Sequence, residues 1–385
     1  MAEQPTLARR HEGGEVTDVR GDGRPADFLH LYGVVGAVGQ RGWRPPGLSV
    51  APAPIGPDSR PASRLGDEVF SVSHGDLAAI VGPTPVRAYR SMKKEDVLPY
   101  LFAHQAVLEK ILAERSVVPV KFGTTARDRE EVHRLLAAGY SQFRAALDAV
   151  EGKIELDVVA LWSDLDALLR ELGEAEEIRR ARPDAIGRSA EETREALLRI
   201  GKMLKAGLDL RREAVATEIV EALRGSATDL CSHALMDDRM ILNTALLVER
   251  SRAGEVGQTL DRLNGRFAER VNFRCVGPLP PYSFSTIEIR CFTAGEIERA
   301  RRLLGVEEKT GTLGAKTAYR RLAHECHPDT GPGGQPTDER FQQVTEAYRV
   351  LTDYYAAAES VRPEDAAAEV ATIRLLRWNG ETDGA

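Results

Sequence analysis

The stretch that decides how the C-terminal part of this chain folds is Ala315-Lys-Thr-Ala-Tyr-Arg-Arg-Leu-Ala-His-Glu-Cys326, followed directly by His327-Pro328-Asp329. Its apolar positions recur at helical spacing and therefore fall on one face of a helix. A different face carries Lys316 and Arg320, with Arg321 beside them. Because proline disfavours the helical conformation in the residue before it, we predict that the helix stops at His327.

A second helix is predicted after a Gly- and Pro-rich loop. Residues 330–336 have the composition of a loop, and the stretch after them places apolar side chains on one side of a helix: Phe341, Val344, Tyr348 and Leu351. Two amphipathic helices joined by a short loop bury their apolar faces against each other. The sequence therefore predicts two antiparallel helices, a basic flank on the first, and an exposed His-Pro-Asp corner between them.

This segment resembles the J-domain of DnaJ-like co-chaperones. The resemblance covers about 294–358 and rests on separated elements in the family's order: Arg302 to Val306, residues 315–323, the His-Pro-Asp triplet, and Phe341 to Asp353. It implies that a DnaK-type ATPase is bound and stimulated by Lys316, Arg320, Arg321, His327, Pro328 and Asp329. The alternative is a plain helical hairpin whose loop happens to contain these residues.

Length and composition limit the class of protein. A chain of 385 residues can hold two or three domains, each with its own core. The formal net charge of −7 argues against nucleic acid as the main partner. The four cysteines are scattered without paired spacing, which is typical of reduced thiols in a cytosol. No apolar run approaches the ~20 residues that span a bilayer, so we expect a cytoplasmic protein.

The N-terminal part is predicted to form a disordered tail over 1–26 and a ferredoxin-like α+β domain over 27–163. The expected elements are, in chain order, a buried strand at 28–38, a hairpin at 69–81, a helix at 96–115, a strand at 117–124, a helix at 128–149 and a closing strand at 154–162. Because the strand at 117–124 contains a proline, we expect it at an edge or a bulge.

A second α+β domain with long helices is expected over 164–293. Its helices should cover 164–182, 189–223 and 255–269, and its strands 243–250, 271–276 and 287–291. Gly201 and Gly207 indicate close helix packing or a bend. The chain then continues into the J-like domain at 294–358 and a C-terminal tail at 359–385. The predicted fold class is α+β: two α+β domains followed by a small all-α domain.

The body of the chain is similar to the gas vesicle protein F/L family. The similarity spans about 28–292, and its stretches follow the family's order: Leu31 to Val35, His104 to Glu109, Val118 to Thr124 and Gly277 to Phe284. It implies two α+β domains and a role in building gas vesicles, which are hollow protein-walled flotation organelles. The implied partners are the main shell protein and other gas vesicle proteins. The J-like extension departs from the family pattern.

Two loops hold candidate partner-binding residues. Phe122 and Gly123 are candidates for an edge that binds shell protein, and the alternative is a strand end that packs on its neighbour. Tyr282 and Phe284 follow a run of three prolines. Such a stiff loop loses little entropy when it binds a partner. The alternative for this loop is a hydrophobic plug between domains.

The sequence gives no indication of an enzyme. Residues 311–317 faintly suggest a phosphate-binding loop, but they lack the glycine directly before Lys316 and the preceding strand that such a loop needs. Metal-type ligands occur within 324–329, but no second cluster completes a tetrahedral site. We therefore expect no catalytic residues, no metal and no cofactor.

The hypothesis that follows is an adaptor. The two α+β domains would hold shell protein while the J-like module recruits a DnaK-type chaperone to the same place. Tethering of this kind raises the local concentration of a partner to the ~mM range for short linkers. Two alternatives remain: a minor structural component of the vesicle wall with a degenerate J-like tail, and a general J-domain co-chaperone with unrelated clients.

Overall fold

The structure is a computed structural model that divides into two compact units, interleaved along the sequence. One unit comprises residues up to Val107, Val120–Tyr140 and Glu288–Arg374, and the other comprises Leu108–Pro119, Ser141–Ile287 and residues from Leu375 onward. The structure describes residues 28–36, 69–84, 89, 92–181, 190–292, 294–326, 338–358 and 370–377. The predicted tail at 1–26 and the predicted His-Pro-Asp corner lie outside the described residues.

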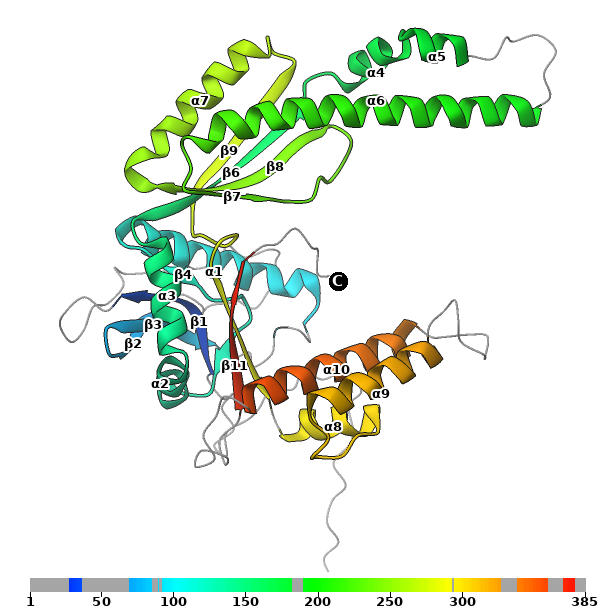
Figure 1. The fold of residues 1–385 in the computed structure, drawn as a ribbon. Helices are drawn as coiled ribbons and strands as arrows, with labels where there is room; N and C mark the ends of the chain where they lie inside the picture. The colour runs from blue at the N-terminus through cyan, green and yellow to red at the C-terminus, as the bar shows by residue number, and fades with distance from the viewer. Residues whose placement is uncertain are drawn as a thin grey trace, which may run out of the picture. The chain divides into compact units, whose positions relative to one another are not determined.

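The first sheet has five strands in the order β2-β3-β1-β4, with β5 also pairing with β1 (Figure 1). Its strands are β1 (Phe28–Gly36), β2 (Phe70–His74), β3 (Leu77–Thr84), β4 (Val118–Pro119) and β5 (Thr125–Ala126). Seven of the nine residues of β1 are buried, as its apolar sequence predicts for a central strand. The predicted hairpin is confirmed as β2–β3, turning at Gly75 with φ 60°. β4 lies at the edge as its proline indicates, but it is shorter than predicted.

Three helices follow in sequence: α1 (Lys94–Glu114), α2 (Arg129–Ala138) and α3 (Tyr140–Val150). The prediction of a single helix at 128–149 is wrong, because the helix is interrupted at Gly139, between α2 and α3. Asp128 caps α2 by accepting a hydrogen bond from the backbone N–H of Glu131 at 2.8 Å. The apolar residues that recur at helical spacing, Val132, Leu136, Phe143 and Leu147, are nevertheless buried.

The second sheet is antiparallel with the order β7-β8-β6-β9. Its strands are β6 (Lys153–Trp162), β7 (Asp229–Ser232), β8 (Met240–Glu249) and β9 (Val271–Leu279). The prediction that the strand at 154–162 closes the first domain is wrong, because it lies inside the second sheet between β8 and β9. The local sequence specifies a strand but not its partner, and β8 offers a long apolar strand to pair with.

The helices of the second unit that follow β6 are α4 (Leu165–Gly173), α5 (Glu176–Ala181), α6 (Ala190–Arg224) and α7 (Ala253–Arg266). The single helix predicted at 164–182 divides into α4 and α5. The long helix predicted at 189–223 is confirmed as α6. Of its two internal glycines, Gly207 packs closely, since a Cβ there would lie 3.4 Å from Leu172 Cδ2. Among the residues that the structure describes, none lies within 4 Å of the corresponding position at Gly201.

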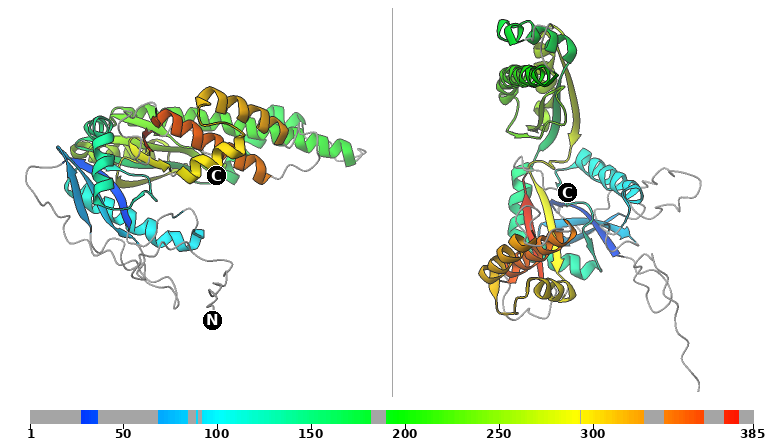
Figure 2. Two further views of the ribbon diagram at one scale, coloured as in Figure 1. Left: turned by 90° about the horizontal axis from the view of Figure 1, so that it is seen from below. Right: turned by 90° about the vertical axis from the view of Figure 1, so that its right-hand side faces the viewer.

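The J-like segment forms three helices, α8 (Ala294–Leu304), α9 (Gly311–Cys326) and α10 (Asp338–Ala358), which lie together in both views (Figures 1 and 2). They share one hydrophobic core that includes Ala315, Tyr319 and Leu322 of α9 and Val344, Tyr348 and Leu351 of α10. The rings of Tyr319 and Tyr348 stack with centroids 4.4 Å apart. The predicted apolar faces of both helices therefore pack together as expected.

A two-stranded sheet flanks these helices: β10 (Thr286–Phe292) pairs with β11 (Val370–Leu376). β10 is the strand that we predicted for the second domain, and β11 lies in the stretch that we predicted as a tail. Asp353 of α10 joins both strands to the helices. Asp353 is 2% exposed, and its carboxylate accepts hydrogen bonds from Arg290 of β10 at 2.7 Å and from Arg374 of β11.

Candidate functional site

The exposed face of α9 is the first candidate site. Lys316, Arg320 and Arg321 are all exposed, because Ala315 and the other apolar residues turn the opposite side of the helix into the core. Arg321 pairs with Glu325 one turn later at 3.3 Å. An exposed pair of this kind contributes at most about 1 kcal/mol to stability, so these cations remain accessible to solvent and to a partner.

The predicted His327-Pro328-Asp329 corner lies outside the described residues. The last described residue of α9 is Cys326, and α10 begins at Asp338. The predicted stop of the helix at His327 therefore lies outside the described residues and stays a prediction. The structure describes the two helices on either side of the triplet, α9 and α10, and the basic face of α9 that precedes it.

Phe122 lies in a cluster of aromatic rings rather than on an open edge. Its ring centroid is 4.9 Å from that of Tyr89, 5.5 Å from His104 and 5.6 Å from His30. Gly123 follows with φ 89°, a conformation that favours glycine. The two residues therefore shape the chain immediately after β4. Their part in binding a partner stays a prediction.

The centre of that cluster is a pair of buried histidines that the sequence analysis missed. His30 Nε2 and His104 Nδ1 lie 2.9 Å apart, and the two residues are 0% and 2% exposed. Burial lowers the pKa of His104 to about 4, and burial together with the charge of His104 lowers the pKa of His30. The pair joins β1 to α1. A polar residue inside the apolar run at 28–38 was the signal in the sequence.

Tyr282 and Phe284 lie on a loop that packs on the second sheet. Phe284 is 8% exposed and shares a core cluster with Cys231, Ala245 and Leu247. Tyr282 is half-buried, and burial raises the pKa of its phenol. The structure does not bring these residues together with Phe122 and Gly123 in one compact unit. Their binding role also stays a prediction.

Glu155 of β6 holds this loop in place. Its carboxylate accepts hydrogen bonds from the backbone N–H and the hydroxyl of Ser283, both at 2.8 Å. Burial raises the pKa of Glu155 to about 7, although the bonds from Ser283 oppose the shift. Gly277 approaches the same strand so closely that a Cβ would lie 2.9 Å from the Glu155 carbonyl oxygen. The Gly- and Pro-containing stretch at 277–284 therefore packs around the buried carboxyl group of Glu155.

Among the described residues, no group of three or more His, Cys, Asp and Glu side chains is arranged to hold a metal ion. In the same part of the chain, no helix is both long and apolar enough to cross a bilayer. The described part of the 324–329 stretch places His324 on the exposed side of α9 and Cys326 in a buried position. The absence of catalytic function and of a cofactor stays a prediction.

The fold and the two kinds of site define a protein with an α+β body and a J-like helical module. Residues 29–286 match the family described as gas vesicle synthesis protein GvpL/GvpF, and residues 302–358 match the DnaJ domain. The chain therefore belongs to the GvpL/GvpF family of gas vesicle synthesis proteins and carries a DnaJ domain after the family region.

Known relatives fall into the same two groups. Over 216 residues the chain is 32% identical to gas vesicle protein F of Streptomyces sp. (strain CB03234), covering 54% of this chain and 84% of that protein. Over 60 residues it is 43% identical to the chaperone protein DnaJ of Synechococcus elongatus, covering 16% of this chain and 21% of DnaJ. The chain thus spans about a fifth of the DnaJ protein that it matches.

A solved structure has the same fold as the body. The crystal structure of the gas vesicle protein GvpF from Anabaena sp. PCC7120 superimposes with a TM-score of 0.54 at 21% sequence identity, covering 67% of this chain and 97% of that protein. The fold class predicted from sequence is confirmed: a body of mixed helices and strands resembling GvpF, followed by a helical region that matches the DnaJ domain.

Proposed function

We propose that this protein is a gas vesicle assembly factor whose body binds shell protein and whose J-domain recruits a DnaK-type ATPase to the same place. The observation that carries the proposal is the union of the two families in one polypeptide, at residues 29–286 and 302–358. A tether keeps both partners within one chain length, which raises their effective concentration to the ~mM range for short linkers.

The geometry of α9 supports the ATPase-binding half of the proposal. Lys316, Arg320 and Arg321 point away from the shared core of α8, α9 and α10, and the chain continues from α9 directly into His327. Exposed like charges on one helix attract an oppositely charged surface and accelerate the encounter. The triplet at 327–329 would then contact the ATPase in the conformation that hydrolyses ATP, which is how binding shifts the rate.

For the body, the proposal assigns shell-protein binding to two separate places, one around Phe122 and Gly123 and the other around Tyr282 in the other unit. Phe284 lies in the core of its own unit, so its contribution would be to hold the loop for Tyr282. The proposed location is the cytoplasm, on or near growing gas vesicles. The proposed partners are the main shell protein, other gas vesicle proteins and the chaperone.

A single-turnover ATPase assay with a DnaK-type chaperone tests the J-domain role. The full-length protein should increase the hydrolysis rate about tenfold or more, and His327→Gln and Asp329→Asn should abolish the increase. Arg299→Ala is the matched control, because Arg299 is an exposed cation on α8 rather than on α9. Stimulation that survives both changes in the triplet rules out this half of the proposal.

Washing isolated gas vesicles tests the proposal against a structural role in the wall. An assembly factor should be released by moderate salt, because its contacts are transient and partly electrostatic. A wall component would stay attached at a fixed ratio to the shell protein after repeated washing. Such retention would favour the alternative in which the J-domain is a degenerate appendage.

A further inference from the structure

The N-terminal half of α6 carries an exposed apolar face. In the C-terminal half, Leu208 and Ile219 are at most 2% exposed. Positions 201, 208 and 219 return to one side of an α-helix, since they are 7 and 11 residues apart. Around Gly201, however, Leu197 and Leu198 are 60% and 58% exposed. Figure 1 shows this half of α6 extending past β8, with α4 and α5 along its other side. The side of α6 that is buried in one half is therefore open in the other.

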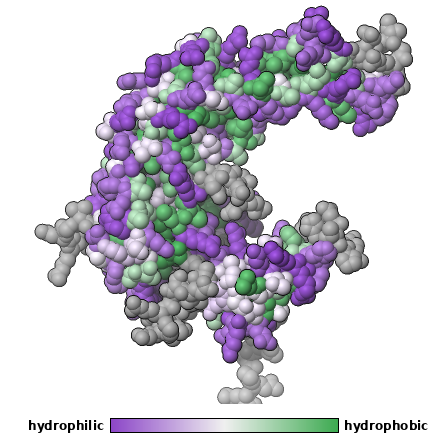
Figure 3. Space-filling model, viewed as in Figure 1, coloured by the Kyte–Doolittle hydropathy of each residue, from purple (hydrophilic) through white to green (hydrophobic). Residues whose placement is uncertain are grey.

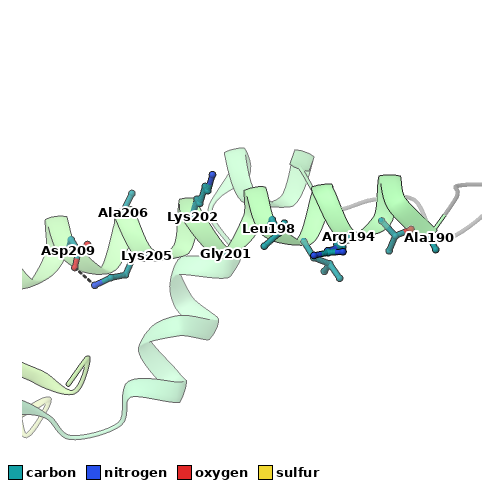
Figure 4. Close-up of a pocket in the computed structure, with 10 residues that line it drawn as sticks. Ala190, Arg194, Leu198, Gly201, Lys202, Lys205, Ala206 and Asp209 are labelled. Carbon is teal, nitrogen blue, oxygen red and sulfur yellow. Dashed lines mark hydrogen bonds and ion pairs between the residues drawn. The ribbon is translucent and has the colours of Figure 1, made fainter. Parts of the chain in front are cut away.

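This face forms a shallow groove of 790 Å³, and the residues that line it all belong to α6 (Figure 4). Leu197, Leu198, Gly201 and Ala206 supply most of its apolar lining, and among the described residues none lies within 4 Å of a Cβ placed at Gly201. The space-filling view shows hydrophobic residues along this helix among hydrophilic ones (Figure 3). A glycine in an open position on an apolar face lets another helix approach the backbone closely. The groove therefore suits a helix that lies along α6.

The charged side chains that line the groove are mostly cations. They are Arg194, Lys202 and Lys205, against the single carboxylate of Asp209. That carboxylate is already compensated, because it pairs with Lys205 at 2.8 Å and with Arg212 at 2.6 Å. Arg194 and Lys202 are exposed, and neither forms an ion pair within the part of the chain that the structure describes. The groove thus presents two unpaired positive charges beside an apolar surface.

The two unpaired cations lie on different flanks of the groove. Residues eight positions apart on an α-helix are about 12 Å apart along its axis and about 80° apart around it. In Figure 4 the side chains of Arg194 and Lys202 point to opposite sides of α6. The exposed carboxylates of Glu191 and Glu195 belong to the same half of the helix but do not line the groove. A ligand in the groove therefore meets a cation on either side of its apolar contact.

We propose that this groove binds an amphipathic helix of another protein, one whose apolar face is flanked by carboxylates. The apolar face of that helix covers Leu197 and Leu198, and its carboxylates pair with Arg194 and Lys202. Charge complementarity selects this occupant, because a helix flanked by cations is repelled by the same two residues. A second copy of the groove would likewise set cations against cations. A helix also fills a groove, which the flat surface of a lipid bilayer does not.

The expected affinity is modest. The stretch from Ala190 to Ala206 is about 24 Å long, so the contact falls at the small end of protein interfaces. We therefore expect a Kd on the order of 10 µM, which weakens as added salt screens the two cations. The groove includes none of Phe122, Gly123 and Tyr282. A failure of this proposal therefore leaves the proposed binding of shell protein and of the ATPase untouched.

Fluorescence anisotropy with the full chain and three labelled model peptides tests the site. The acidic peptide is an amphipathic helix about 18 residues long, with a stripe of leucine and alanine between glutamates. The basic peptide has lysine in place of every glutamate, and the third peptide has the acidic composition in scrambled order. The acidic peptide should bind with a Kd on the order of 10 µM, and the other two at least tenfold more weakly. Equal or tighter binding of the basic peptide overturns the proposal.

Charge reversal on α6 tests the residues themselves. The double variant Arg194→Glu, Lys202→Glu should prefer the basic peptide, and Leu198→Glu should weaken the binding of the acidic peptide at least tenfold. Arg199→Glu is the matched control, because Arg199 is an exposed cation of the same helix that does not line the groove. A preference for the acidic peptide that the double variant retains, or that Arg199→Glu reduces equally, contradicts the assignment.

Two further measurements address the other occupants that an apolar face flanked by cations could have. Vesicles of phosphatidylglycerol and phosphatidylcholine should not co-sediment with the wild-type protein through this face. In sedimentation velocity without peptide, Leu198→Glu should behave as the wild type does over the whole concentration series. Vesicle binding or self-association that Leu198→Glu abolishes would assign the face to a bilayer or to a second copy, and either result overturns the proposal.

Discussion

The J-domain and the two strands that flank it use arginines in two opposite ways. Arg290 and Arg374 turn toward Asp353, a carboxylate with a 3% exposed side chain, and tie α10 to the flanking strands β10 and β11. Arg320 and Arg321 of α9 remain exposed, with one surface pair to Glu325. The comparison teaches that burial, rather than residue type, decides whether a charge supports the scaffold or is available to a partner. Changes in the two groups should therefore affect different measurements.

The largest effect is expected at the buried group. Asp353→Ala leaves Arg290 and Arg374 without their buried carboxylate partner. Removing one partner of a buried ion pair typically costs about 3 kcal/mol of stability or more. Amide hydrogen exchange in α10, β10 and β11 should become correspondingly faster. Glu325→Ala is the matched control, since it removes the carboxylate of the exposed pair, and it should change exchange in α9 by less than about 0.5 kcal/mol. Equal effects of both changes would break the comparison.

A buried acid in the body extends the comparison to pH. Because burial raises the pKa of Glu155 to about 7, the folded state favours its protonated form. This contribution is fully present below the unfolded pKa of about 4.5 and is lost as pH rises through 7. Over that range the stability of the second sheet should fall by up to about 3 kcal/mol from this group. Exchange measured in β6 and β9 at several pH values should lose this slope in Glu155→Gln.

The buried histidines should give a slope of the opposite sign. Burial lowers the pKa of His104 to about 4, so the folded state favours the neutral ring. The contribution is complete above the unfolded pKa of about 6.5 and is lost as pH falls toward 4. On acidification, the free energy of opening that amide exchange measures in β1 and α1 should fall by about 2 kcal/mol, because the burial is not complete. His104→Phe should reduce this dependence and leave the part that buried His30 contributes, and an unchanged slope would show that His104 does not control it.

The smallest expected effect on stability is at the exposed face of α9. Arg321→Ala removes one surface ion pair and should change the melting temperature by about 1 °C or less, because such pairs contribute little. Added salt should have an equally small effect on that melting temperature. A loss of several degrees would mean that Arg321 supports the scaffold like Arg290, and the distinction between the two groups would fail.

Local patterns predicted the parts of this fold that local sequence determines. The apolar faces of α9 and α10, the buried strand β1 and the long helix α6 were predictable because their periodicity matches their burial. Sheet membership was not, since β6 pairs with a strand about 90 residues away in the sequence and β10 pairs with β11 across the whole J-domain. Strand pairing depends on distant partners that a local window does not contain.

The candidate sites divide in the same way. The basic residues of α9 could be placed on an exposed face because their neighbours define the opposite, buried one. Asp353 could not be recognised as an anchor, because its two arginines are 63 and 21 residues away in sequence. The same holds for His30 and His104, which are separated by 74 residues. Each of these contacts exists only once the chain is folded.

The most direct test of the account is the salt dependence of ATPase stimulation by the wild-type protein and by the double variant Lys316→Glu, Arg320→Glu. The account predicts that wild-type stimulation falls several-fold between about 50 and 300 mM salt, because screening weakens the attraction. The double variant should stimulate at least tenfold less at low salt while keeping its melting temperature. Stimulation by the double variant equal to that of the wild type, with no dependence on salt, would contradict the claim that this exposed face meets the ATPase.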